Sequence, residues 1–153
     1  DALRAMALSV DEIRDVCNLR KCSGAWSILL RNESPLIPIE IYRFFRTAGS
    51  TGVDLAVKTL AEYSAKIGSE FSQDEWLRIL SLCGTLLEAW FTKPELIYPA
   101  PLLNGDALIR EFNLESGPMI GELLEQLIEE QVGGFIKTEN QASQWIRSKL
   151  RTK

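Results

Sequence analysis

The sequence of 153 residues contains no histidine, few cysteines and no long apolar run. Without histidine, the chain lacks the usual general base of serine and cysteine hydrolases and the most frequent ligand of catalytic metals. Cys17, Cys22 and Cys83 fit no zinc-binding spacing and cannot all pair, so we expect reduced, mostly buried thiols of a cytoplasmic protein. No apolar run approaches the roughly 18 residues of a membrane helix, so we expect no membrane partner.

Nucleotide-binding signatures are also missing. Residues 49–52, GSTG, lack both the preceding strand and the following pattern of a phosphate-binding or dinucleotide-binding loop. These absences predict no catalytic residue, no metal site and no cofactor in this chain. Because the chain begins with Asp1 and its first residues already have helical character, we expect a fragment of a longer protein.

Helical signals cover almost the whole sequence, whereas no stretch shows the alternation of a strand. Residues 9–12, 72–75 and 138–141 have the capping-box pattern that opens a helix. Pro38 and Pro118 fit the first turn of a helix, where a missing N–H costs nothing. We therefore expect an all-α fold, a multi-helix array of about eight helices. The expected helices cover residues 10–20, 24–31, 38–49, 51–68, 73–93, 105–112, 118–132 and 139–150.

The connector at residues 93–104, KPELIYPAPLLN, holds three of the six prolines. It is too apolar for a free linker, so we expect an extended segment that packs along the preceding helices. This connector would divide a helical body, residues 1–92, from a small tail subdomain of three short helices, residues 105–153.

Two arginines of the predicted helical body are placed so that they could bind a phosphate group. Arg43 and Arg46 are three residues apart and share a helix face, and the planar guanidinium matches the geometry of phosphate oxygens. The alternative is structural, because Arg46 near a helix end could pair with Asp54 at the start of the next helix.

The tail contains a second candidate phosphate site. Gly117, before Pro118, would leave the first amides of a helix exposed, and such amides can hold an anion. The alternative is that Gly117 and Gly121 only permit close helix packing. The last nine residues, WIRSKLRTK, carry four positive charges and no acid, but a net charge of −4 argues against a generally basic nucleic-acid binder. The four tryptophans lie on apolar helix faces, which indicates core packing rather than base stacking.

The order of motifs resembles a known family. FFRTAGSTGVDLAVKTLAEYSA is followed by a tryptophan-rich helix and then by PLLNGD, GPMIGELLE and GGFIKT. This order resembles the C-terminal helical region of bacterial tRNA nucleotidyltransferases, the CCA-adding enzymes and poly(A) polymerases, including members with an HD domain. The resemblance covers about residues 3–150 and is most specific in the last three motifs. Thr47 departs from the acid that many relatives have after the arginine of the FFR motif.

The resemblance implies a helical part that holds RNA for a separate catalytic head. In the family, the head binds Mg²⁺ through two carboxylates and selects CTP and ATP, and none of its motifs is present here. Expected partners are therefore tRNA or other RNA and the catalytic N-terminal part of the same enzyme. The expected RNA or phosphate contacts are Arg43, Arg46, Arg110 and the backbone amides at Gly117.

Two other interpretations are compatible with the sequence. The chain could be a scaffold or oligomerisation domain of such an enzyme with no RNA contact of its own, which the acidic balance favours. The short helices after residue 104 could also form a helix-hairpin-helix-like module that binds DNA. Whether the parent adds CCA, A only or poly(A) depends on the missing head.

Overall fold

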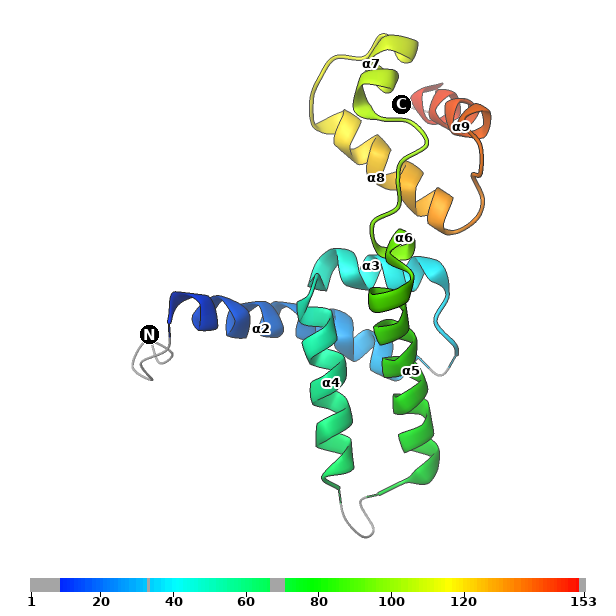
Figure 1. The fold of residues 1–153 in the computed structure, drawn as a ribbon. Coiled ribbons are helices and arrows are strands. Elements are labelled where there is room, and N and C mark those ends of the chain that lie inside the picture. The colour runs from blue at the N-terminus through cyan, green and yellow to red at the C-terminus, as the bar shows by residue number, and fades with distance from the viewer. Residues whose placement is uncertain (1–8, 33, 67–70, 152–153) are drawn as a thin grey trace. The chain divides into compact units, whose positions relative to one another are not determined.

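The computed structural model describes residues 9–32, 34–66 and 71–151, and in these ranges the chain forms eight helices and no strand. The prediction of an all-α fold is confirmed (Figure 1). The helices are α2 (Val10–Arg31), α3 (Pro38–Ala48), α4 (Thr51–Ser64), α5 (Gln73–Thr92), α6 (Pro94–Ile97), α7 (Gly105–Phe112), α8 (Pro118–Val132) and α9 (Glu139–Arg151).

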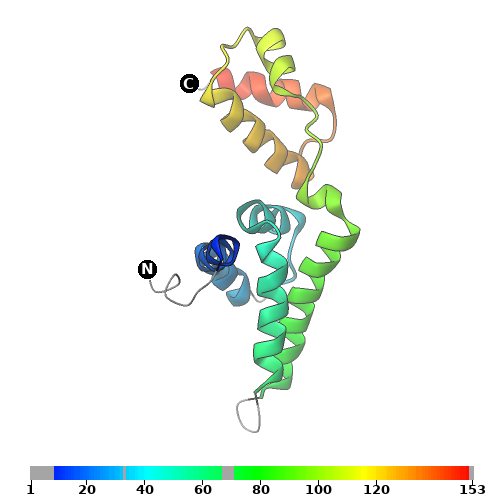
Figure 2. The ribbon, with the colours of Figure 1, turned by 60° about the vertical axis from the view of Figure 1, so that its left-hand side comes forward.

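The chain divides into two compact units, Asp1–Ile97 and Tyr98–Lys153, and the division falls inside the predicted connector. In the first unit α4 and α5 run side by side in opposite directions, and α2 packs against α3 and α4 (Figures 1 and 2). Among the described residues, sixteen from α2 to α6 are buried in the first core. Aromatic rings run through it from Trp26 to Phe44, Phe45 and Trp90, with successive ring centroids 5.1 to 5.6 Å apart, as expected of core tryptophans.

The first unit differs from the prediction in its first helix. Residues 10–31 form one helix, where the sequence predicts two with a break before Gly24. A glycine inside a helix costs only about 1 kcal/mol relative to alanine, and burial of Cys22, Trp26 and Leu29 on one face offsets it. Packing therefore overrides the local glycine signal. The side chain of Glu12, which the first capping box would need, lies outside the described residues.

The connector begins with helix α6, so the prediction of a wholly extended segment is wrong at residues 94–97. Pro94 stands at the first position of this turn, where proline is tolerated. Leu96 and Ile97 then pack against the first core, whereas Leu102 and Leu103 belong to the second.

The second unit is built from α7, α8 and α9, which match the expected ranges to within a residue. Asn104 caps α7 because its side chain accepts the N–H of Ala107 at 2.9 Å. The side chain of Gln131 on α8 holds the preceding chain in two places, donating to the carbonyl of Ala100 and accepting the N–H of Leu102. Its core contains eight buried residues: Leu103, Leu108, Ile120, Leu123, Leu127, Ile136, Ala142 and Ile146. Among the described helices, none combines the length and apolar character needed to cross a membrane.

Candidate RNA-contact residues

Arg43 and Arg46 lie on the exposed arc of α3. The opposite arc is unusually wide, because Phe44 and Phe45 are both buried although they are adjacent in sequence. Arg43 also lines a groove of about 340 Å³, together with Leu29, Phe44 and the carboxylate-bearing Glu40. The predicted arginine pair thus shares one helix of the first unit.

A glycine turn fixes the direction in which α3 ends. Gly49 has φ +54°, a conformation that L side chains rarely adopt, and its N–H donates to the carbonyl of Phe45 at 2.7 Å. Gly52 follows in the first turn of α4, where a Cβ would lie 2.7 Å from Cε1 of Phe44 and 2.9 Å from Cε1 of Phe45. Close packing at Gly52 therefore fixes the direction in which α4 continues from α3.

Arg110 and Gly117 belong to the second unit. Arg110 is exposed in the last turn of α7, and its Nε donates to the carbonyl of Asp106 at 3.3 Å. Gly117 is the exposed N-cap of α8, with extended backbone and no side-chain cap, and the first turn of α8 carries no acid. The predicted contacts are thus shared between the two units, Arg43 and Arg46 in the first and Arg110 and Gly117 in the second.

The glycine-packing alternative at the start of α8 is not supported within the second unit. Apart from neighbouring residues and the backbone of α8, no described heavy atom lies within 4 Å of a Cβ built on Gly117 or Gly121, and both residues are exposed. The close approach expected at these glycines occurs at Gly52 instead.

Helix α9 carries a basic surface near its C-terminal end. Arg147, Lys149 and Arg151 are exposed. The guanidinium of Arg147 lies 3.3 Å from Oε1 of Glu111, and Nζ of Lys149 lies 4.9 Å from the ring centroid of Trp145. Cations beside an aromatic ring can contact both the phosphates and the bases of RNA.

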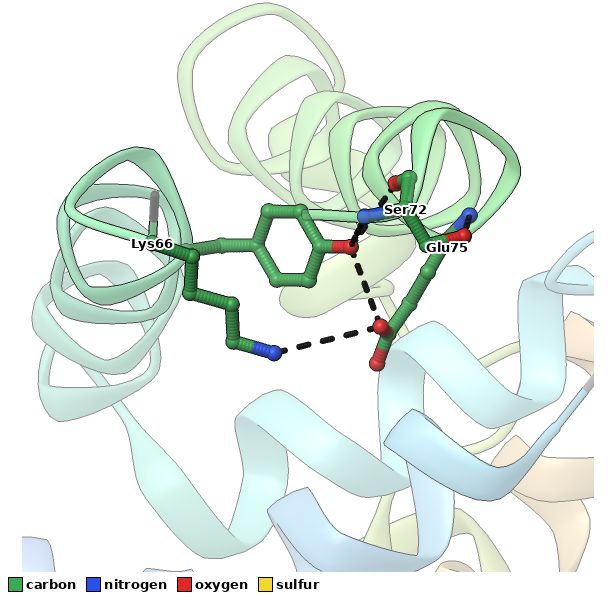
Figure 3. Close-up of polar contacts among 4 residues, drawn as sticks. Lys66, Ser72 and Glu75 are labelled. Atoms are coloured by element: carbon green, nitrogen blue, oxygen red, sulfur yellow. Dashed lines mark hydrogen bonds and ion pairs between the residues drawn. The ribbon is translucent and has the colours of Figure 1, made fainter. Parts of the chain in front are cut away.

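A polar cluster between the end of α4 and the start of α5 was not predicted from the sequence. The hydroxyl of Tyr63 on α4 accepts the backbone N–H of Ser72 at 3.0 Å and lies 3.0 Å from Oε2 of Glu75. Nζ of Lys66 lies 4.2 Å from the Tyr63 ring centroid and 3.9 Å from Glu75 Oε2. Figure 3 shows Lys66, Ser72 and Glu75 converging around this ring. The sequence predicts a capping box at residues 72–75, in which the Glu75 side chain would accept the Ser72 N–H. In the structure the Tyr63 hydroxyl accepts this N–H instead.

Two further features of the described residues concern metal ligands and thiols. No group of three or more Cys, Asp or Glu side chains there could hold a metal ion. Cys22 and Cys83 are buried, whereas Cys17 is exposed, so the expectation of buried thiols holds for two of the three. Burial raises the pKa of the Cys83 thiol from 9.0 to about 11, which disfavours the nucleophilic thiolate.

Comparison with protein-family models, with curated proteins and with solved structures gave no match to this chain.

Proposed function

We propose that the chain is the RNA-holding helical part of a tRNA nucleotidyltransferase or poly(A) polymerase. The observation that supports this proposal is that the three most specific motifs mark the helix boundaries of one folded unit. Asn104 of the first motif caps α7, Gly117 and Pro118 of the second open α8, and the third begins at Gly133, directly after α8. Motifs with this spacing therefore define a complete three-helix unit.

In this proposal the partners are tRNA and the catalytic part of the same enzyme, which would supply Mg²⁺ and select CTP or ATP in the cytoplasm. A-form RNA offers side chains mainly phosphates and 2′-hydroxyls, so a few well-placed cations are enough to hold it despite the acidic net charge. Arg43 and Arg46 are the proposed contacts of the first unit. Arg110, the amides at Gly117 and the basic end of α9 are those of the second.

The decisive experiment titrates labelled tRNA, and a duplex DNA of equal charge, into the chain at several salt concentrations and follows fluorescence anisotropy. We expect tighter binding of tRNA, with a shallow decrease of log K against log salt that reports a few phosphate contacts. Preference for duplex DNA would favour the helix-hairpin-helix interpretation. No binding of either nucleic acid would contradict an RNA-holding role for this chain.

A second candidate function, protein docking or self-association, is favoured by an apolar stripe on α5. Leu77, Leu80 and Phe91 are exposed by 53%, 43% and 70%, and Gly84 lies between them with open space above it. The spacing of three, four and seven residues places all four on one face of α5, beside the face that enters the core. Exposed apolar patches of this kind mark interaction sites.

Light scattering as a function of concentration distinguishes this second candidate. Self-association through the stripe predicts a mass that rises with concentration and a return to the monomer mass in Leu77→Glu/Phe91→Glu. A monomer at all concentrations, together with tRNA binding, favours the first proposal.

A further inference from the structure

A small hollow opens between the end of α2, the loop that follows it and the middle of α5. Its volume is about 190 Å³, and its polar lining consists of Asn32, Ser34, Arg78, Ser81 and Thr85. We call it the α2–α5 hollow. All of its lining belongs to the first unit, so its geometry depends on that unit alone.

Arg78 is the single cation among the described residues that line the α2–α5 hollow. The side chain is half-buried, and Nη1 donates to the backbone carbonyl of Leu30 in the last turn of α2. This bond orients the guanidinium and offsets the partial negative charge of the helix end. Since arginine has five N–H donors in a fixed fork, one bond to Leu30 leaves donors for another acceptor.

The other polar groups shape the hollow and add hydroxyls. The side chain of Asn32 accepts the N–H of Ser34 at 3.1 Å, so both lining residues of the loop are joined by a hydrogen bond. The hydroxyl of Thr85 donates to the carbonyl of Ser81 at 2.9 Å. Ser34 and Ser81 contribute two further hydroxyls to the same lining.

The described lining of the α2–α5 hollow contains one cation, Arg78, and no carboxylate. Arg78 also borders a neighbouring pocket whose lining includes Glu62 and Glu75. Glu40 lies behind Asn32, where Oε1 accepts from the Asn32 amide at 3.2 Å and Oε2 from the N–H of Ile37 at 3.0 Å. Glu33 follows Asn32 in the sequence, and its side chain lies outside the described residues.

We propose that the α2–α5 hollow binds a phosphate group through the guanidinium of Arg78 and the hydroxyls of Ser34 and Ser81. An oriented arginine fork beside hydroxyl donors is the donor set that phosphate oxygens require. The volume lies below the roughly 300–1,000 Å³ of pockets that enclose drug-sized ligands, so the hollow takes the phosphate and leaves the rest of the molecule outside. The inference does not rest on the proposed function, because a phosphate could come from RNA or from a small phosphorylated molecule.

The test follows backbone amide shifts of the ¹⁵N-labelled chain while inorganic phosphate replaces chloride at constant ionic strength and pH. Saturable shifts are expected at residues 34, 81 and 85. Ser81→Glu places a carboxylate in the hollow without removing the bond between Arg78 and Leu30. Its matched control is Ser64→Glu on α4, where the native hydroxyl donates to the carbonyl of Leu60, and which makes the same change of charge away from the hollow.

We expect Ser64→Glu to bind phosphate as the unchanged chain does, and Ser81→Glu to bind it at least about tenfold more weakly, the effect of losing one charge-assisted hydrogen bond. Arg78→Lys keeps the charge but loses the fork, and weaker binding is expected there too. Equal affinities in Ser81→Glu and Ser64→Glu, or no saturable shift in the unchanged chain, would overturn the proposal.

Two short RNAs then identify the source of the phosphate, one with a 5′-phosphate and one with a 5′-hydroxyl. Shifts at residues 34, 81 and 85 with both RNAs assign a backbone phosphate, and shifts with the first alone assign a terminal one. Shifts with inorganic phosphate but with neither RNA assign a small phosphorylated ligand, and they would leave the phosphate site standing even if tRNA binding fails.

Discussion

The hydroxyl of Tyr63 accepts the backbone N–H of Ser72 at 3.0 Å, so the last turn of α4 is bonded to the N-cap of α5. The same hydroxyl lies 2.7 Å from the carbonyl of Ser72, and the ring stacks on Trp76 with centroids 5.7 Å apart. One side chain thus holds the two neighbouring helices of the first unit at the end where they are joined.

Tyr63→Phe should lower the free energy of unfolding by about 1–2 kcal/mol, because it leaves a partly buried N–H without its acceptor. Urea unfolding followed by circular dichroism measures the change. Ser64→Ala is the control, since its hydroxyl bonds the carbonyl of Leu60 inside α4, and a change of no more than about 0.5 kcal/mol is expected. Equal midpoints for both variants would show that the Tyr63 hydroxyl does not stabilise the fold.

Alanine at two glycines should have opposite effects. Gly52→Ala places a methyl 2.7 Å from the Phe44 ring, in a core that cannot give way easily, and should destabilise by about 1–3 kcal/mol. Gly121→Ala adds a methyl in open space on an exposed helix and should stabilise by about 0.4–1 kcal/mol. Thermal melting of the two variants checks the difference. Destabilisation at Gly121 would mean that something packs there.

Removal of both α3 arginines tests the predicted RNA contact. Arg43→Ala/Arg46→Ala should weaken tRNA binding and reduce the slope of log K against log salt by about 1–2, since each phosphate that is no longer neutralised lowers the slope by about one. Lys58→Ala/Lys93→Ala removes the same charge from two other exposed positions of the first unit. Equal weakening in both double variants would assign the effect to net charge, and a changed melting curve would assign it to the fold.

The three thiols should react at very different rates. At pH 8 the exposed Cys17 should react quickly with a thiol reagent, whereas Cys83, with its pKa raised to about 11, should react only on unfolding. The raised pKa means that the unfolded chain loses this proton first, so the contribution of Cys83 to stability is present below pH 9 and falls as the pH rises toward 11. Cys83→Ala should therefore flatten the decline of stability in that range. Rapid reaction of all three thiols in native buffer would contradict the burial of Cys83.

The helix boundaries that the sequence predicted well are those marked by local chemistry. Asn104 before α7 and Pro118 at the start of α8 act through their own backbone or side chain, so their effect can be read without knowing the neighbours. The prediction of a break at Gly24 was wrong because the cost of a helical glycine is small and the burial of Trp26, which depends on α3, decides the outcome.

The candidate sites also divide into features that local sequence predicts and features that depend on tertiary packing. The shared face of Arg43 and Arg46 follows from helical spacing, which the sequence contains. The α2–α5 hollow does not follow from local spacing, because Arg78 forms a hydrogen bond with Leu30, which is 48 positions away in the sequence. Likewise, nothing near Tyr63 in the sequence indicates that its hydroxyl would displace Glu75 at the start of α5.

The two separate cores have a consequence for how the chain opens. Since sixteen of the described residues are buried in the first core and eight in the second, the second unit should open more often at equilibrium. In native-state hydrogen exchange, the most protected amides of α8 and α9 should have lower protection factors than the most protected amides of α4 and α5. The region with the most specific motifs would then be the first to lose its structure as conditions become harsher, and an RNA bound there would slow its exchange selectively.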